Sequence, residues 1–272
     1  LLPRIAAGEL VMALAHAEPG SGQLLAHVAT RAMPDGTGWL LRGHKSAVLH
    51  GDQAGVCIFS ARLRGGDHDP EGLALFLVDA GAPGLRRSTY RMQDGLGGAE
   101  LVFEDLRVEA DAMLGTPGEG LALLQRLQDH AIAAQAAECV GAMRALHALT
   151  VDYLKTRKQF GVSIGSFQVL QHRCVDMLVE IEQARSMAMY ASMMVASDDA
   201  AARGTAMSAV KLQVARAARG VAQKSLQLHG GIGMATEYAA SHYVLRLTAA
   251  QMRFGDAGHH LRALAAHEPV LS

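Results

Sequence analysis

The chain has 272 residues, which is enough for two domains with sizeable hydrophobic cores. Half of the residues are hydrophobic, 19% are charged, and the formal net charge is -1 at pH 7. This balance excludes the basic face with which nucleic-acid-binding proteins neutralise phosphates. No apolar run approaches the roughly 18 residues of a membrane span, and the first residues lack the basic-then-apolar order of a signal peptide. We therefore expect neither a nucleic-acid partner nor a membrane partner.

Cysteine and histidine spacing gives no sign of a metal site or a disulfide framework. Cys57, Cys139 and Cys174 are far apart and form no C-x-x-C pair. His259 and His260 are adjacent, so on a helix they point about 100° apart and do not easily bind one metal ion. We expect no metal and a reducing, cytoplasmic location.

The first part of the chain is typical of a β domain. Short apolar runs such as 39–42, 55–60 and 73–78 alternate with turns rich in Gly, Pro and Asp. The turns recur near the spacing of about 8 to 12 residues found in sandwiches and barrels. The pattern predicts an antiparallel β sandwich or barrel over residues 1–112.

After Gly120 the composition changes to Ala, Leu, Met, Gln and Arg, with apolar residues such as Leu121, Leu124 and Leu127 at helical spacing. We predict three long helices and two shorter ones at 118–157, 166–197, 200–229, 237–252 and 257–266. They form an antiparallel four-helix-type bundle over residues 113–272, so the fold class is α+β. The Ala-rich and Met-rich faces favour contact with another subunit, and we expect an oligomer.

Three motifs suit binding of an anion, or of a ligand that contacts the main chain. They are R-K-Q-F-G at 157–161, Q-L-H-G-G-I-G at 227–233 and F-G-D-A-G-H-H at 254–260. Glycines let main-chain N–H groups approach a ligand, and Arg157 offers a fork of donors to a phosphate or pyrophosphate.

Together these motifs resemble the acyl-CoA dehydrogenase family, flavoenzymes that remove hydrogens from Cα and Cβ of a CoA thioester. The resemblance also includes A-E-P-G-S-G at 17–22, L-R-G-H-K at 41–45 and M-L-G-T-P-G-E-G at 113–120, all in the family's order. It covers the whole chain. The family normally begins with a further helical domain of roughly 100 residues, which is absent here, so we expect a truncated or partial form whose acyl pocket is open on one side.

The resemblance implies an FAD between subunits, with its ring against the β domain and its pyrophosphate on a neighbouring helical domain. Seven residues match the family's cofactor-binding positions: Arg157, Gln159, Phe160, Gln168, Gln227, Gly230 and Gly231. Arg157 would donate charge-assisted hydrogen bonds, Phe160 would form an apolar wall, and Gln227 would offer an amide. The alternative is that Arg157 and Lys158 form a solvated helix end and that the glycines only end a helix.

The matching position for the family's catalytic carboxylate is Asp256. Its side chain is one methylene shorter than the family's usual glutamate, which sets its oxygen back by roughly 1 to 1.5 Å. The residue also suits the N-cap of a helix that starts at 257, and both interpretations stay open. The family's other location for the base matches Ala131, which has no carboxylate. Asp129 matches an aspartate near the substrate's pantetheine arm, while Ile132 stands where an active-site arginine is common.

Around the implied flavin ring the chain departs further from the family. Ala17, Gln23, Ala47 and Leu49 occupy positions where hydroxyl, small polar or tryptophan side chains are common. His16 and His50 flank these positions and would either replace the missing donors or be hydrogen-bonded parts of the β domain.

The resemblance implies an FAD-dependent subunit that oxidises an acyl-CoA thioester to the 2,3-enoyl-CoA, in a homo- or hetero-tetramer, with an electron-transferring flavoprotein as acceptor. The segment 242–261 is most similar to the small subunit of dicarboxylyl- or steroid-side-chain-type acyl-CoA dehydrogenases. This likeness supports an alternative, in which the chain is a non-catalytic partner that completes the FAD site of a competent paralogue.

Overall fold

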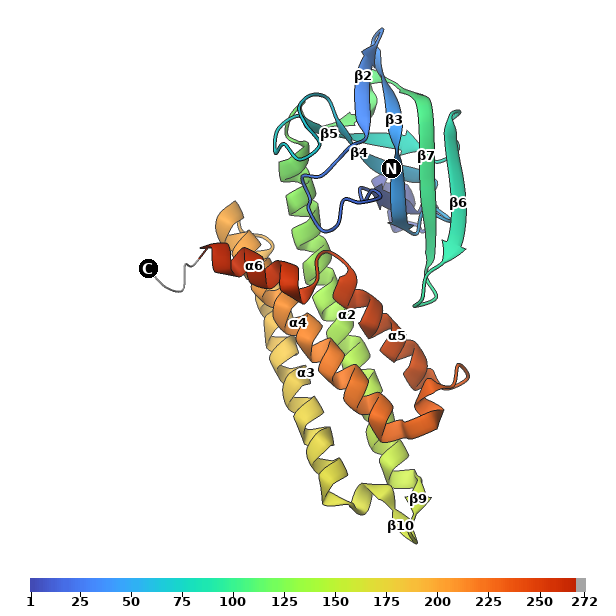
Figure 1. The fold of residues 1–272 in the computed structure, drawn as a ribbon, viewed down its shortest axis with the longest axis vertical. Helices are drawn as coiled ribbons and strands as arrows, with labels where there is room; N and C mark the ends of the chain where they lie inside the picture. Colours follow the sequence, from blue (N-terminus) through green and yellow to red (C-terminus); the bar gives the residue numbers. More distant parts are fainter. Residues whose placement is uncertain (268–272) are drawn as a thin grey trace. The chain divides into compact units, whose positions relative to one another are not determined.

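The computed structural model describes residues 1–267 and divides into two compact units, the first Leu1–Arg126 and the second beginning at Leu127 (Figure 1). The division falls inside the long helix α2, while the domain boundary predicted between residues 112 and 113 stays a prediction. Among residues 1–267 no helix is both long and apolar enough to cross a bilayer.

The first unit is built on an eight-stranded sheet with the order β6-β7-β3-β2-β4-β5-β8, and β1 pairs with β4. The elements are α1 (Leu2–Ala6), β1 (Met12–Ala15), β2 (Arg31–Asp35), β3 (Gly38–Leu49), β4 (Val56–Arg62), β5 (Leu73–Asp79), β6 (Leu85–Arg91), β7 (Gly97–Val108), η1 (Ala110–Ala112) and β8 (Met113–Leu114). The β-rich character agrees with the prediction. The purely antiparallel sheet does not, because β1 and β2 both pair parallel to β4. Parallel neighbours need connections longer than a hairpin, and local turn signals do not reveal them.

Strand β5 shows why the first unit holds together. Its sequence L-A-L-F-L-V-D is buried almost throughout, because alternate residues face two different clusters. Ala74, Phe76 and Val78 face the main sheet core, while Leu73 and Leu75 pack with Val28 and Leu124. Each fully buried Leu or Phe contributes on the order of 1.5–3 kcal/mol.

An ion pair lies inside this unit. Lys45 on β3 is fully buried, and its Nζ donates to Glu18 Oε1 at 2.5 Å and to Ser60 Oγ at 2.9 Å. Glu18 also accepts from the Ala29 and Thr30 amides and from the Thr30 hydroxyl. Burial lowers the pKa of Lys45 to about 8, with Glu18 opposing the shift. The pair therefore ties the loop at 18–30 to the sheet.

Replacing Lys45 with Met should lower the free energy of unfolding by about 3–5 kcal/mol, since it leaves the Glu18 carboxylate buried without its cation. The double variant Lys45→Met, Glu18→Gln should lose less than the sum of the two single losses. Urea denaturation measures both. Arg64→Ala, which removes an exposed ion pair with Glu71, serves as the control and should cost at most about 1 kcal/mol. Equal losses for Lys45→Met and Arg64→Ala would contradict a structural role for the buried pair.

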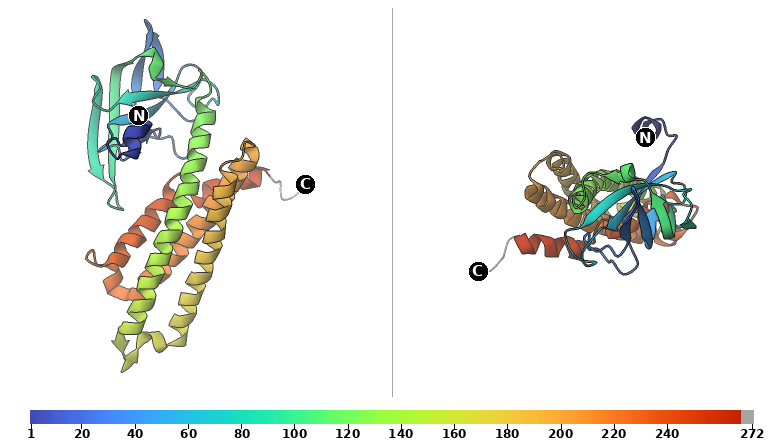
Figure 2. Two further views of the ribbon diagram at one scale, coloured as in Figure 1. Left: turned by 180° about the vertical axis from the view of Figure 1, so that it is seen from behind. Right: turned by 90° about the horizontal axis from the view of Figure 1, so that it is seen from above.

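The second unit is helical, and the predicted helix ranges are confirmed to within three residues at every end. Its elements are α2 (Gly120–Thr156), which starts in the first unit, then β9 (Lys158–Gln159), β10 (Val162–Ser163), η2 (Ile164–Ser166), α3 (Gln168–Met194), α4 (Ala200–His229), η3 (Gly230–Met234), α5 (Ala239–Met252) and α6 (Ala257–His267). Helix α3 packs against α4, which also packs against α5 and α6 (Figure 2). The four-helix-type description of this unit stays a prediction.

Local sequence explains where α4 begins and ends. The Asp199 carboxylate caps its start by accepting from the Ala201 and Ala202 amides, each at 3.0 Å. Gly230 ends it with φ +62°, a conformation that favours glycine. Between these caps one face carries Ala206, Val210 and Ala217 into the core, where small side chains let the helices approach closely.

Candidate functional site

A hairpin at the end of α2 presents an aromatic side chain to solvent. Phe160 and Gly161 form the turn between β9 and β10, with φ +54° and +79°. Two consecutive residues with positive φ suit a tight hairpin, but for phenylalanine this conformation costs on the order of 1–3 kcal/mol. The Phe160 side chain is nevertheless 90% exposed, and its ring meets the Phe167 ring edge-to-face at 6.2 Å. The chain thus holds a strained aromatic residue outside its core.

The end of α4 lies beside this hairpin. Thr150 Oγ1 on α2 is 2.7 Å from Ser225 Oγ on α4, and one turn further the Tyr153 and His229 rings are 4.9 Å apart. The Arg157 amide donates to the Tyr153 carbonyl, so Arg157 lies one helical turn beyond the contact between Tyr153 and His229. The structure therefore brings the predicted cofactor residues to one end of the helical unit. All seven residues of this set are exposed: Arg157, Gln159, Phe160, Gln168, Gln227, Gly230 and Gly231.

The residues at this end fit a dinucleotide. No atom from other parts of the described chain lies within 4 Å of the place where a Gly231 side chain would be, so the backbone there is open to a ligand. Ile232 and Met234 next to it are exposed apolar residues. A guanidinium, open backbone and apolar walls are the groups that bind a pyrophosphate flanked by rings. The binding role of these residues stays a prediction.

Asp129 and Asp256 belong to the other end of the same unit. Asp129 is buried, and its Oδ2 accepts from Arg203 Nε at 2.7 Å. Arg203 also donates to the Ser197 carbonyl, so the pair joins α2 to the start of α4. Arg203 and Gln227 are 24 residues apart on one helix, which corresponds to about 36 Å at 1.5 Å per residue. The substrate role of Asp129 stays a prediction, and its carboxylate already has a structural partner.

Asp256 follows a turn with two unusual backbone conformations. Phe254 and Gly255 have φ of +57° and +96°. Asp256 Oδ1 then accepts from the His259 amide at 2.7 Å, which caps the start of α6. Gln128, next to Asp129, donates from Nε2 to the Phe254 carbonyl at 3.4 Å. The capping contact expected from the sequence is present, while the role of Asp256 as a base stays a prediction.

Two of the four positions expected around the flavin ring lie close together in the first unit. The Ser46 amide donates to the Ala17 carbonyl, which sets the exposed residues Ala17 and Ala47 close together. His16 takes part in the structure of the β domain, since its Nδ1 lies 2.9 Å from Ser60 Oγ in the buried Lys45 network. Burial and the neighbouring Lys45 lower the pKa of His16 to about 4. His50 contacts Gln53 at 3.3 Å.

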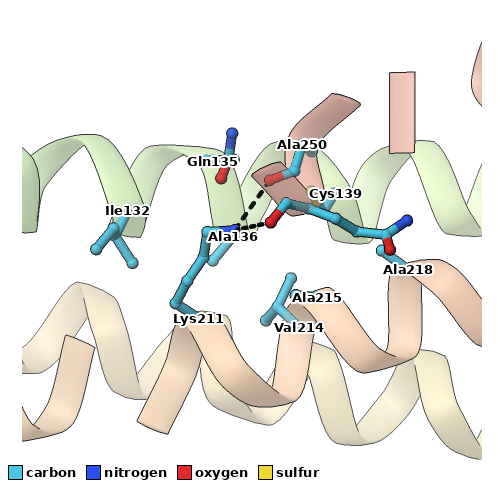
Figure 3. Close-up of a pocket in the computed structure, with 10 residues that line it drawn as sticks. Ile132, Gln135, Ala136, Cys139, Lys211, Val214, Ala215, Ala218 and Ala250 are labelled. Atoms are coloured by element: carbon cyan, nitrogen blue, oxygen red, sulfur yellow. Dashed lines mark hydrogen bonds between the residues drawn. The ribbon is translucent and has the colours of Figure 1, made fainter. Parts of the chain in front are cut away.

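Sequence reasoning missed a buried lysine in the second unit. Lys211 on α4 is 3% exposed, and its Nζ donates to the Ala250 and Gln251 carbonyls at 2.9 and 3.2 Å (Figure 3). It lines a cavity of about 10 Å³, room for roughly one water molecule and far too small for a flavin or an acyl chain. The signal that could have revealed it is a lysine between Val210 and Val214 on an otherwise apolar helix face.

Comparisons with known proteins identify the family of this chain. Residues 13–106 match the family model of the acyl-CoA dehydrogenase middle domain, and residues 118–268 match that of the acyl-CoA dehydrogenase C-terminal domain. The chain belongs to the acyl-CoA dehydrogenase family. The proteins of this family related to it are FAD-dependent oxidoreductases.

Individual relatives give the extent of the similarity. The chain is 28% identical over 267 residues to the human mitochondrial short-chain specific acyl-CoA dehydrogenase, and 33% identical over 243 residues to the long-chain specific enzyme of Sus scrofa. These matches cover 94% and 87% of this chain but only 64% and 56% of the relatives, so the chain spans less than two thirds of their length. A glutaryl-coenzyme A dehydrogenase in complex with glutaryl-CoA is similar in structure, with a TM-score of 0.89 at 26% identity over 97% of this chain and 67% of that chain.

Lys211 gives the unfolding equilibrium a characteristic pH dependence. Burial lowers its pKa from 10.5 to about 8, so between these pH values the folded chain has released a proton that the unfolded chain keeps. The unfolded state binds more protons there, and the stability contributed at this site therefore rises with pH across that window, by about 1.4 kcal/mol for each step of one in pH. Urea denaturation across the window should show this rise in the wild type relative to Lys211→Met. Lys224→Met, which removes a partly exposed lysine from the same helix, should keep the wild-type pH dependence; a parallel Lys211→Met curve would contradict the assignment.

Proposed function

We propose that this chain is a subunit of an FAD-dependent acyl-CoA dehydrogenase, which oxidises an acyl-CoA thioester to the 2,3-enoyl-CoA. The observation that supports the proposal most is the gathering of Arg157, Phe160, Gln227 and Gly231 at one end of the helical unit in a chain of this family. The strained, exposed Phe160 is otherwise unexplained, since an aromatic side chain gains nothing from water.

Each residue has a defined task in this proposal. Arg157 binds the pyrophosphate through charge-assisted hydrogen bonds, the amides at Gly230 and Gly231 approach it, and Phe160 covers an apolar part of the cofactor. Bound FAD supplies the hydride acceptor. Asp256, at the N-terminus of α6, takes the α-proton of the thioester on its carboxylate.

Partners follow from the same proposal. The exposed apolar side chains Val175, Val179 and Met193 on α3 support a homo- or hetero-tetramer. An electron-transferring flavoprotein is the proposed acceptor, and a solved structure described as the electron transferring flavoprotein of Acidaminococcus fermentans is similar to this chain, with a TM-score of 0.90 at 28% identity. The cytoplasmic location expected from the cysteine pattern stays a prediction.

A second candidate is a non-catalytic subunit that donates the dinucleotide-binding end to a competent partner, as in the small subunit of dicarboxylyl- or steroid-side-chain-type enzymes. Two observations favour it. Asp256 is engaged in capping α6, and the exposed residues Ala17 and Ala47 offer no hydroxyl or indole to a flavin ring. In this version the chain keeps Arg157 and Phe160 for binding the cofactor but does not itself abstract the α-proton of a substrate.

Arg157→Ala should weaken FAD binding, because it removes charge-assisted hydrogen bonds that contribute about 1.5–3 kcal/mol. The dissociation constant should rise about 10- to 100-fold in a fluorescence titration with FAD. Arg185→Ala is the matched control, since Arg185 is an exposed arginine on α3 that pairs with Glu182 on the same helix. Unaltered affinity in Arg157→Ala would remove the pyrophosphate assignment and with it both candidate functions.

Asp256→Asn separates the two candidates without disturbing the helix cap, since asparagine caps helices as well as aspartate does. A catalytic chain should lose about 10²- to 10⁴-fold in the exchange of the α-proton of butanoyl-CoA in D₂O, while its flavin content stays constant. In the non-catalytic version the purified chain shows no exchange above background in either form. Exchange that is fast and equal in both forms would exclude Asp256 as the base.

A further inference from the structure

Residues of α4 support the turn that carries Asp256 from two directions: at the end of α5 before the turn, and at His260 after it. The last carbonyl groups of any helix lack partners within that helix. At the end of α5, Lys211 Nζ donates hydrogen bonds to two such carbonyl groups, those of Ala250 and Gln251 (Figure 3). The lysine reaches them from inside the unit, where it is almost fully buried.

His260 holds the other side of the turn. Its Nε2–H donates to the Phe254 carbonyl at 2.8 Å, because a carbonyl only accepts. Its Nδ1 therefore accepts, and the Ser208 hydroxyl lies 3.2 Å from it. Ser208 and Lys211 are one turn apart on α4, so a single helix anchors both sides.

The glycine before Asp256 packs directly on this imidazole. A Cβ atom at Gly255 would lie 2.6 Å from His260 Nε2, closer than real Cβ contacts allow. The turn also keeps Phe254 in a left-handed conformation that phenylalanine rarely adopts. Such a conformation persists only where the surroundings impose it. His260 and Gln128 both contact the Phe254 carbonyl, and Lys211 holds the last turn of α5 just before it.

We infer that Lys211 and His260 are positioning residues that fix the turn at 253–256 and thereby the place of the Asp256 carboxylate. This inference rests on the proposed role of Asp256 as the base. A carboxylate that is one methylene shorter than glutamate depends more strongly on its backbone position, because rate falls steeply with misplacement on the scale of 1 Å.

Both anchors act over a wide pH range. Burial lowers the pKa of Lys211 to about 8 and that of His260 to about 4. A neutral lysine still has two protons for its two carbonyl acceptors, and a neutral histidine still has the Nε2 proton for Phe254. Lys211 is therefore a cation below about pH 8 and neutral above it, and it holds the turn in both states.

Lys211→Met tests the inference, since it keeps most of the side-chain volume and removes both donors. In the purified chain with bound FAD, we expect the backbone amides of residues 257–260 to exchange with D₂O about tenfold faster. The rate of α-proton exchange of butanoyl-CoA should fall about 10- to 100-fold, with its KM changed less than about threefold. Ser208→Ala, a milder change at a half-buried site, should act in the same direction and serves if Lys211→Met does not fold. Lys224→Met, on the same helix but paired with Glu180 on α3, should change neither rate.

Each outcome decides one step. Unchanged amide exchange in both Lys211→Met and Ser208→Ala overturns the inference. Faster amide exchange with undiminished proton exchange shows a merely structural contact and also overturns it. If proton exchange survives in Asp256→Asn, the proposed base is wrong and the positioning role falls with it, although the amide exchange still reports whether Lys211 holds the turn. Loss of proton exchange in Asp256→Asn together with the expected Lys211→Met result supports both.

Discussion

Two buried cations on α4 determine how the helical unit is assembled. Arg203 and Lys211 lose their hydration on folding, and a buried cation is tolerated only when hydrogen bonds replace that water. Arg203 obtains them from Asp129 on α2 and from Ser197 before α4, while Lys211 obtains them from the end of α5. Helical propensity alone would leave these elements free to slide. The cations favour the observed register, because a shift of the helices would separate each cation from its oxygens and leave it buried without them.

This arrangement gives the helical unit two chemically different ends. The end near Arg203 and Lys211 contains the two buried cations and the Asp256 turn, whereas the end near Gln227 exposes Arg157 and Phe160. About 36 Å of helix separates them, at 1.5 Å per residue. Within one chain, α4 therefore keeps the proposed base Asp256 far from the proposed pyrophosphate-binding residue Arg157. The separation supports the expectation that an FAD is shared between subunits, with each chain contributing one end to each of two sites.

The sequence predicted the elements of the fold better than their contacts. The α4 limits were accurate because Asp199 and Gly230 are local signals, readable from neighbouring residues. The parallel pairing of β1 with β4 was missed, because it joins residues more than forty positions apart and leaves no periodic trace. The buried roles of Lys45, Arg203 and Lys211 were also missed. A cation on an apolar face reads as a solvated side chain until the partner oxygens, which come from distant segments, are known.

Asp256 was ambiguous in the sequence for a physical reason that the structure makes clear. Capping and proton abstraction make opposite demands on the same carboxylate: the helix end stabilises its negative charge, while a base must give that charge up to a proton. Oδ1 already accepts from the His259 amide, and Ala131 offers no second carboxylate at the family's other location. Ala17 and Ala47 also lack the polar groups that the family commonly has at the predicted flavin-ring positions. The end with the predicted dinucleotide-binding residues shows no comparable departure, since Arg157, Phe160, Gln227 and Gly231 are all present and exposed. Predicted binding residues that are kept, together with predicted catalytic positions that depart from the family, favour the second candidate, the non-catalytic partner subunit.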